Sequence, residues 1–378
     1  MRKSKDFFRG IGFVIVSGGG GFLFSLLGLS IGWMIGSLLT ATALSILSPK
    51  LVGRDYKQAG IPKYWLYIGQ CILGIELGKK INSTVFSIFQ ENWVTITIML
   101  LLSLILSLLS GICLWKYSKL DMQTSLFATA PGGLSSIPGI AEEAGANTGV
   151  VSVVQTMRAL LVVLTIPVMV SFWGSNPEEY THGYAVHREA TRFEVEEILM
   201  TMLLVLSAWL GYYIGRRLKF PAPWLIGSIV GVAAVKTFIS LSIGYDFVAW
   251  WPQYLIIASQ IFIGASIGSR FHRDMFKEIN RTLLLSFFGI IGLIVFTFIC
   301  AYIVSMVTEI TLLTSALAFT PGGITEMTTA ALVLNGDFTF VVVVQVLRVV
   351  AVCIILPPLF RFLKYWELKK KSHFHLPE

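Results

Sequence analysis

The sequence is poor in charged side chains, because Asp, Glu, Lys and Arg make up only 13% of its 378 residues while 55% are hydrophobic. Ordinary soluble domains carry about 25% charged residues. Together with a mean hydropathy of +0.76, this composition excludes a soluble globular protein. About ten membrane crossings of about 20 residues each, with the short loops that join them, leave no room in the chain for a separate soluble domain of typical size. We therefore expect the function to lie inside the bilayer.

Cysteine and histidine are also scarce, and neither forms a metal-binding or redox pattern. The four cysteines lie in apolar stretches without CxxC spacing, which predicts neither a disulfide framework nor a thiolate metal site. The five histidines fall in polar loops or in the tail, so an intramembrane copper or iron centre lacks its His ligands. We expect no cofactor, no metal and no catalytic residue, and hence no enzyme.

Apolar runs occur in two sets of five, and an offset of 190 residues aligns 62–167 with 252–357 without a gap. Upstream, an offset of 191 aligns 33–37 with 224–228. The matches fall on Gly, Pro, Gln, Arg and Trp rather than on interchangeable apolar residues, which indicates an internal repeat. Identical pairs include Pro62 and Pro252, Gln70 and Gln260, Gly74 and Gly264, Pro131 and Pro321, Gln155 and Gln345, and Arg158 and Arg348.

The positions of Lys and Arg indicate how the two repeats are oriented. If each repeat crosses the membrane five times, 22 basic residues lie on the cytoplasmic side and four outside. If each repeat crosses the membrane six times, 17 basic residues lie on the cytoplasmic side and nine outside. Cytoplasmic loops carry the excess of Lys and Arg in membrane proteins, so inverted repeats are favoured. The net charge of +8 is explained by this topology, and no nucleic-acid partner is expected.

These features predict an all-α polytopic membrane protein with about ten transmembrane helices in two inverted five-helix repeats. Each repeat is expected to contain a broken or re-entrant Pro-Gly-Gly segment. We expect a bacterial plasma membrane protein with both termini in the cytoplasm. The expected domains are a first membrane repeat at 1–172, a polar extracytoplasmic connector at 173–197, a second membrane repeat at 198–365 and a cytoplasmic basic tail at 366–378.

The two Pro-Gly-Gly segments are the first candidate site. Proline removes a backbone donor and clashes with the preceding turn, so neither segment is expected to be continuous helix. Broken helices near the bilayer midplane form the solute sites of many transporters, although a Gly-rich packing surface is the alternative. The candidate solute-binding residues here are Pro131, Gly132, Gly133 and Ser135 in the first segment and Pro321, Gly322, Gly323 and Thr325 in the second.

A Gln-x-x-Arg motif follows each segment, as Gln155 with Arg158 and as Gln345 with Arg348. Each Arg is expected about 15 Å into its helix, near the bilayer centre. Ionisable residues at that depth are costly and mark functional sites. Two interpretations stay open and are compatible: the motif binds the solute, or each Arg holds carbonyl groups that the break leaves free.

Two acids have no counterpart in the other repeat. Glu326 follows the second Pro-Gly-Gly segment and aligns with Ser136, and Glu76 aligns with Ser266. An acid in only one of two matched positions is a candidate for ion coupling, because it can change charge alone. The alternatives are a fixed salt bridge for Glu326 and an interfacial position for Glu76. Gln70 and Gln260 are further candidates to line the cavity, and hydrogen bonding between helices explains them equally well.

The doubled unit resembles the AbrB family of bacterial membrane proteins in its Trp33–Ser37 and Trp224–Ser228 segments, its Pro-Gly-Gly segments and its Gln-x-x-Arg helices. The resemblance covers nearly the whole chain and implies two tandem copies of one module. Family members carry labels such as regulator of gene expression and ammonia monooxygenase. The sequence offers neither a DNA-binding element nor the intramembrane histidines that these labels imply.

The leading hypothesis is a secondary transporter of a small solute, with the buried arginines favouring an anion. The alternative is a membrane sensor or regulatory protein that affects gene expression without transport. The expected partners are the lipid bilayer and the solute, and a homo-oligomer is left open. The sequence contains no ATP-binding motif, so transport would be driven by ions or potential, or would be passive.

Overall fold

The computed structural model describes residues 2–28, 31–47, 60–81, 84–131, 137, 141–142, 145–173, 195–243, 250–271 and 280–373. Across these residues the chain forms thirteen helices and no strand. Most of the predicted connector and the end of the tail lie outside the described residues. The all-helical class predicted from the sequence is confirmed.

The helices follow the same order in the two halves of the sequence. The first half contains α1 (Arg2–Ser25), α2 (Gly32–Leu47), α3 (Tyr64–Lys80), α4 (Thr84–Tyr117), α5 (Met122–Thr129) and α7 (Thr148–Trp173). The second half contains α8 (Val195–Arg217), α9 (Pro223–Ile243), α10 (Gln253–Gly268), α11 (Asn280–Val307), α12 (Leu312–Phe319), α13 (Ile324–Val333) and α14 (Phe338–His373). Because α14 continues to His373, the start of the predicted tail is helical.

Among the described residues, five helices are long and apolar enough to cross a membrane. They are Phe8–Ser25, Gln90–Tyr117, Thr148–Val170, Glu197–Arg217 and Arg281–Val307. Other apolar helices are shorter, such as α2 and α10 with 16 residues each. At 1.5 Å per residue such a helix spans about 24 Å, less than the hydrocarbon core of about 30 Å. The structure therefore has the composition of a membrane protein, and the ten crossings stay a prediction.

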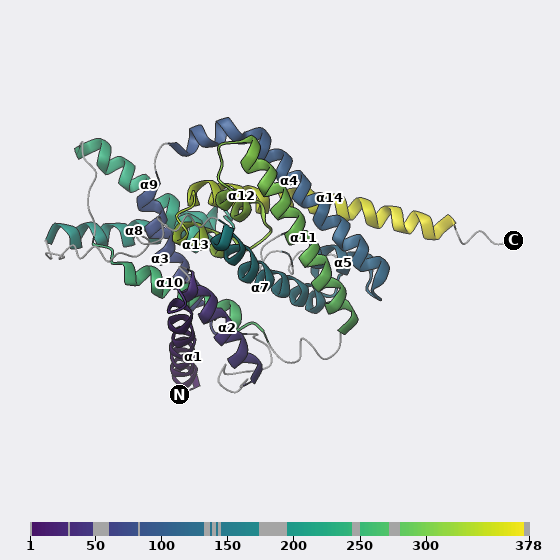
Figure 1. The fold of residues 1–378 in the computed structure, drawn as a ribbon, viewed down its shortest axis with the longest axis horizontal. Coiled ribbons are helices and arrows are strands. Elements are labelled where there is room, and N and C mark those ends of the chain that lie inside the picture. Colours follow the sequence, from purple (N-terminus) through teal and green to yellow (C-terminus); the bar gives the residue numbers. More distant parts are fainter. Residues whose placement is uncertain are drawn as a thin grey trace.

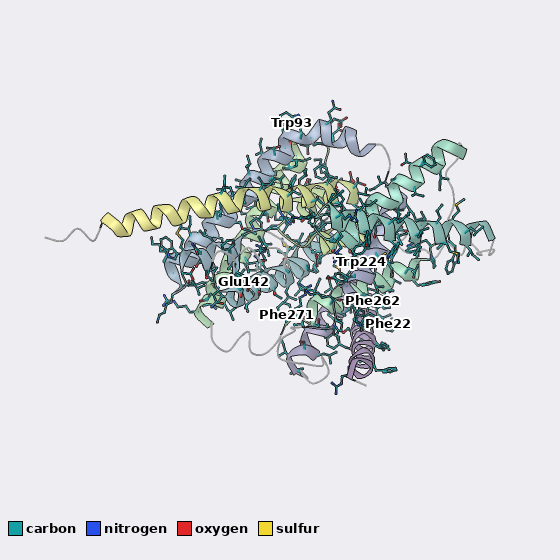
Figure 2. All side chains as sticks on the ribbon, turned by 180° about the vertical axis from the view of Figure 1, so that it is seen from behind. Phe22, Trp93, Glu142, Trp224, Phe262 and Phe271 are labelled. Atoms are coloured by element: carbon teal, nitrogen blue, oxygen red, sulfur yellow. The ribbon has the colours of Figure 1, made fainter. Side chains whose placement is uncertain are left out.

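The side chains that face outward are those expected next to lipid. Large apolar residues are exposed along α4, α8 and α11, and they include Trp93, Trp209 and Phe288. Figure 2 shows Trp93 at the outer edge of α4, away from the packed centre. A contiguous apolar surface of this kind in water would drive association, whereas in a bilayer it contacts acyl chains. The exposed surface thus agrees with the helix lengths.

The helices form two bundles, and each bundle takes helices from both halves of the sequence (Figure 1). In bundle I, α1 packs on α2, α8 on α9, α2 on α10, α9 on α3, and α3 on α10. In bundle II, α4, α5 and α7 pack with α11, α12, α13 and α14. The element of bundle II that packs most closely on bundle I is α13, which contacts both α3 and α10.

Glycines set the tightest crossings in bundle I. A Cβ atom on Gly227 of α9 would lie 2.5 Å from the carbonyl oxygen of Gly211 on α8. The aligned glycines Gly20 and Gly36 meet in the same way between α1 and α2. Small residues let helix backbones approach closely, which is the usual basis of helix packing in membranes. The repeated glycines therefore allow the backbones of α1 and α2, and those of α8 and α9, to approach each other equally closely.

Candidate functional site

The second Pro-Gly-Gly segment separates two short helices. Thr311 begins α12, where its side chain accepts a hydrogen bond from the amide of Thr314. The helix ends at Phe319, the chain is non-helical from Thr320 to Gly323, and α13 begins at Ile324. Pro321 has no amide hydrogen to continue the helical hydrogen bonds, which explains where α12 ends.

The first Pro-Gly-Gly segment begins in the same way. Asp121 accepts a hydrogen bond from the amide of Thr124 at 2.8 Å, and α5 ends at Thr129. Pro131 follows and is buried. The other predicted residues of this segment, Gly132, Gly133 and Ser135, lie outside the described residues. The comparison between the two segments therefore rests on the helices that precede them.

The Gln-x-x-Arg motif of α14 holds the carbonyl end of α12. The side-chain amide of Gln345 donates to the carbonyls of Leu317 at 2.8 Å and Thr320 at 3.2 Å. The guanidinium of Arg348 donates to Thr320 at 2.7 Å and to Gly322 at 2.8 Å. The last carbonyls of a helix have no partner within the helix and carry its negative dipole end, so a cation is stabilised there.

The motif of α7 holds α5 by equivalent bonds. Gln155 donates to the carbonyl of Phe127 at 2.9 Å. Arg158 donates to the carbonyls of Thr129 and Ala130, both at 2.9 Å. The carbonyl-holding interpretation of the motif is thus observed in both halves. Solute binding by these residues stays a prediction.

The two arginines are deeply buried, and the motifs keep some unused hydrogen-bonding capacity. Their exposed fractions are 6% for Arg158 and 3% for Arg348. The positive charge of Arg158 acts on Arg348, so the two guanidinium groups share one electrostatic environment. Within the described part of the chain, the Nε atom of Arg348 and the Oε1 atom of Gln155 have no hydrogen-bond partner. Holding carbonyls therefore does not use every polar atom of the motifs.

Glu326 folds back over the beginning of α13. It is buried at 7% exposure, and its carboxylate lies against the backbone of Gly323. A Cβ atom on Gly323 would lie 2.5 Å from the carboxyl carbon of Glu326, so only glycine fits beneath this side chain. A carboxylate in the first turn is stabilised by the positive end of the helix dipole. The candidate anion position at the start of α13 thus carries a carboxylate of the chain itself.

Glu326 interacts electrostatically with Arg270, which follows α10, rather than with an arginine of the motifs. Sequence pattern alone does not single out Arg270, because it lies among the basic residues expected in a cytoplasmic loop. A signal was present in the repeat: Arg270 aligns with Lys80, so both repeats place a basic residue at this helix end. The charge of Glu326 therefore belongs to the region where α10 meets α13.

Gln70 connects the two bundles. Its side-chain amide on α3 donates to the hydroxyl of Thr325 on α13 at 2.9 Å. Thr325 is a predicted site residue, and Gln70 was a further candidate for the cavity lining. The structure brings both together with Gly322, Gly323 and Glu326 at the start of α13.

Glu76 has different surroundings. Its carboxylate forms ion pairs with Lys80 at 3.0 Å and Lys79 at 3.6 Å, both on α3. The ammonium of Lys236 on α9 donates to the carbonyl of Lys79 at 2.8 Å. Glu76 is thus held among lysines at one end of α3, whereas Gln70, six positions earlier in the sequence, contacts the start of α13. An ion-coupling role for Glu76 stays a prediction.

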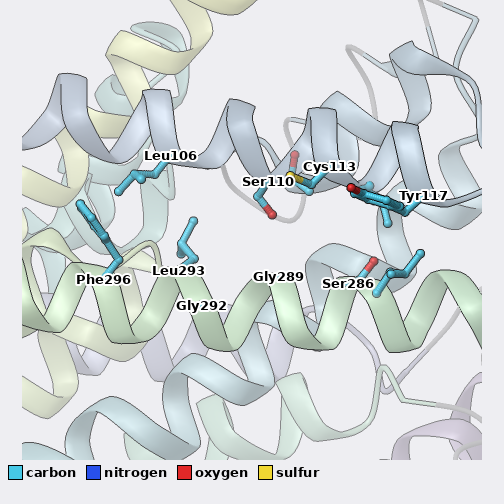
Figure 3. Close-up of a pocket in the computed structure, with 12 residues that line it drawn as sticks. Leu106, Ser110, Cys113, Tyr117, Ser286, Gly289, Gly292, Leu293 and Phe296 are labelled. Atoms are coloured by element: carbon cyan, nitrogen blue, oxygen red, sulfur yellow. The ribbon is translucent and has the colours of Figure 1, made fainter.

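A cavity of about 280 Å³ lies between α4 and α11 (Figure 3). Apart from Thr129, its lining comes from these two helices. Figure 3 shows Ser110 and Cys113 on one side and Gly289, Gly292 and Leu293 on the other. None of the predicted site residues lines it. The cavity adjoins the candidate site only through Thr129, whose carbonyl Arg158 holds.

Metal ligands do not gather anywhere in the part of the chain that the structure describes. No group of three or more His, Cys, Asp or Glu side chains occurs there. The polar groups around the break are instead amides, hydroxyls, guanidinium groups and one carboxylate. Such groups bind a small polar or charged solute rather than a transition metal.

A family model described as "Transition state regulatory protein AbrB" matches residues 33–364. The chain belongs to the AbrB family. The resemblance inferred from the Pro-Gly-Gly and Gln-x-x-Arg motifs is confirmed. The family match includes all the predicted site residues, from Glu76 to Arg348.

Two relatives match over nearly their whole lengths. "Uncharacterized protein YhjN" of Bacillus subtilis (strain 168) is 45% identical over 374 residues, which cover 98% of this chain and 97% of the relative. "Putative regulator AbrB" of Escherichia coli (strain K12) is 25% identical over 355 residues, which cover 91% and 96%. Neither these names nor the family description states an enzymatic activity.

Proposed function

We propose that this AbrB-family protein is a secondary transporter of a small solute in the bacterial plasma membrane. The observation that carries the proposal is the position of the break between α12 and α13. The helix that follows it, α13, is the element of bundle II that packs most closely on bundle I, and Gln70 bonds to its first turn. A solute site at the junction of two rigid bodies is the arrangement that alternating access requires.

Matched contacts support two inverted repeats with ten crossings. The Gln155 bond to Phe127 corresponds to the Gln345 bond to Leu317 at the 190-residue offset. The hydroxyls of Thr124 and Thr314 likewise accept bonds from the amides of Asn147 and Asp337. With the distribution of Lys and Arg, these pairs support cytoplasmic termini and an outside connector. The short apolar helices would then cross within the protein interior, partly shielded from lipid.

The buried charges support an anionic solute. Arg158, Arg348 and Arg270 lie around the break regions, and Glu326 is the acid among them. A buried positive charge in a low-dielectric region is costly, and a bound anionic solute would reduce this cost. Glu326 would couple transport to protons, because protonation removes a negative charge that competes with the solute at the start of α13. Lipid and the solute are the proposed partners, with a homo-oligomer left open.

The second candidate is a membrane sensor that regulates gene expression without transport. This candidate is supported by the name of the Escherichia coli relative, which calls that protein a regulator. The same site would then bind a solute and change the arrangement of the two bundles. Both candidates predict binding, and only the transporter predicts exchange of the solute across a membrane.

Exchange in proteoliposomes tests the proposal. Vesicles containing the purified protein are loaded with a mixture of small organic and inorganic anions, and labelled anions are added outside. We expect at least one labelled anion to accumulate by exchange, and protein-free vesicles to accumulate none. If an anion raises the thermal stability of the protein but none exchanges, the transporter proposal is wrong and the sensor is favoured.

A further inference from the structure

The glutamines of the two repeats differ in one respect. Gln70 donates to Thr325, Gln155 donates to Phe127, and Gln345 donates to the carbonyls that end α12. Gln260 on α10 is completely buried, and among the residues that the structure describes neither Oε1 nor Nε2 of its side chain has a hydrogen-bond partner. Within this described part of the chain, three of the four amides are therefore bound by the protein itself and the fourth is not.

The position of Gln260 places it at the junction of the bundles. Helices α3 and α10 cross closely at Gly69, where a Cβ atom would lie 3.1 Å from the carbonyl oxygen of Ser259. Gln70 and Gln260 each follow one residue after this crossing. Gln70 reaches the first turn of α13, and α10 itself packs on α13. Gln260 thus lies at the crossing of α3 and α10, the two helices of bundle I that α13 contacts.

Leaving such an amide unpaired is unfavourable. A buried donor or acceptor without a partner loses its bonds to water, whereas an apolar side chain of similar shape carries no such penalty. Leucine at position 260 would therefore be the more stable choice for a purely structural role. An unpaired buried amide at a bundle junction is the pattern expected of a residue whose partner is a ligand.

We propose that Gln260 binds the transported solute, and that this solute is a small organic anion with a hydroxyl or amide donor beside its carboxylate. The side-chain amide has an acceptor oxygen, Oε1, and a donor nitrogen, Nε2. A ligand that satisfies both atoms at once carries a hydrogen-bond donor next to an acceptor. A carboxylate oxygen accepts from Nε2, and the neighbouring hydroxyl or amide donates to Oε1. The anionic part of this inference rests on the function proposed above.

Matched pairs of anions test the proposal on the purified protein. The pairs are lactate with propionate, malate with succinate, and oxamate with pyruvate, in which the first member alone carries the donor. We expect the first member of at least one pair to stabilise the protein against heat with about tenfold tighter binding, as one additional hydrogen bond provides. If the parent protein binds both members of every pair equally tightly, the proposal is wrong.

Two variants decide whether Gln260 makes this discrimination. Gln260→Leu and Gln260→Met are expected to be at least as thermostable as the parent without solute, and to bind both members of a pair equally. Gln253→Leu is the matched control: Gln253 is exposed in the first turn of the same helix α10, so its replacement should leave the discrimination unchanged. Retained discrimination in both Gln260 variants, or destabilisation of both, would show that the amide has a structural role and refute the proposal.

The outcome for Gln260 is separable from the outcome for transport. Discrimination that depends on Gln260 without anion exchange in vesicles would leave the binding site standing and remove the transporter. Anion exchange without such discrimination would leave the transporter standing and remove the role of Gln260.

Discussion

Replacing Arg348 with lysine tests whether the Gln-x-x-Arg motif holds the break together. Two nitrogens of the guanidinium reach two separate carbonyls, Thr320 at 2.7 Å and Gly322 at 2.8 Å. Lysine keeps the positive charge but presents one compact ammonium on a flexible chain, without the planar fork of arginine. We expect the ammonium to hold one of the two carbonyls and to release the other.

The magnitude follows from the bond that is lost. Thr320 also accepts a bond from Gln345, so the carbonyl left without a partner is that of Gly322. A hydrogen bond to a charged group contributes about 1.5–3 kcal/mol. Because the buried charge is retained, no gain in solvation offsets this loss. Arg348→Lys should therefore lower the free energy of unfolding by about 1.5–3 kcal/mol.

Equilibrium unfolding in detergent micelles, followed by circular dichroism, measures this loss. Arg217→Lys is the matched control, because Arg217 is exposed at the end of α8 and its replacement should change stability by less than about 0.5 kcal/mol. Equal stability of the two variants would refute the carbonyl-holding role of Arg348. Reduced solute binding at unchanged stability would instead assign Arg348 directly to the solute.

Three further predictions concern the motion, the coupling and the topology. The double variant Gln70→Cys with Thr325→Cys, joined by a thiol cross-linker, should lose the anion exchange that each single-cysteine variant retains, because the hydrogen bond between these positions connects the two bundles. Exchange by the cross-linked protein would contradict rearrangement of the bundles. Glu326→Gln should abolish uptake driven by a pH gradient while solute exchange continues, because exchange needs no net proton movement. Loss of folding and of both activities would indicate a fixed salt bridge, since removal of one partner leaves the other charge buried. A variant whose single cysteine replaces Ser175 should be labelled from outside intact cells, and labelling only after lysis would refute the inverted arrangement.

Several features of the site follow from local sequence. Pro321 prevents α12 from continuing, and the hydroxyl of Thr311 and the carboxylate of Asp121 cap α12 and α5. The internal repeat predicts that whatever Gln155 does, Gln345 does also, and both amides indeed hold equivalent carbonyls. These features depend on residues close in sequence or on a direct comparison of the repeats.

The partners of the buried polar groups could not be predicted from the sequence. Sequence spacing puts Gln345 and Arg348 on one face of a helix, but either carbonyls or a solute could meet that face. The bond from Gln70 to Thr325 joins residues 255 positions apart. The pairing of Glu326 with Arg270 depends on how α10 approaches α13, which no local pattern specifies.

The sequence by itself determined the apolar, membrane-like composition, the helical class, the pattern of repeated residues and the end of α12 before Pro321. Hydrophobic composition, proline chemistry and repeated polar residues are properties of the chain alone. The tertiary structure decided that helices of both halves combine in two bundles, that the arginines hold helix ends, and that Gln260 has no partner among the residues described. These outcomes depend on which helices approach one another, because a buried polar group takes its role from the atoms that surround it.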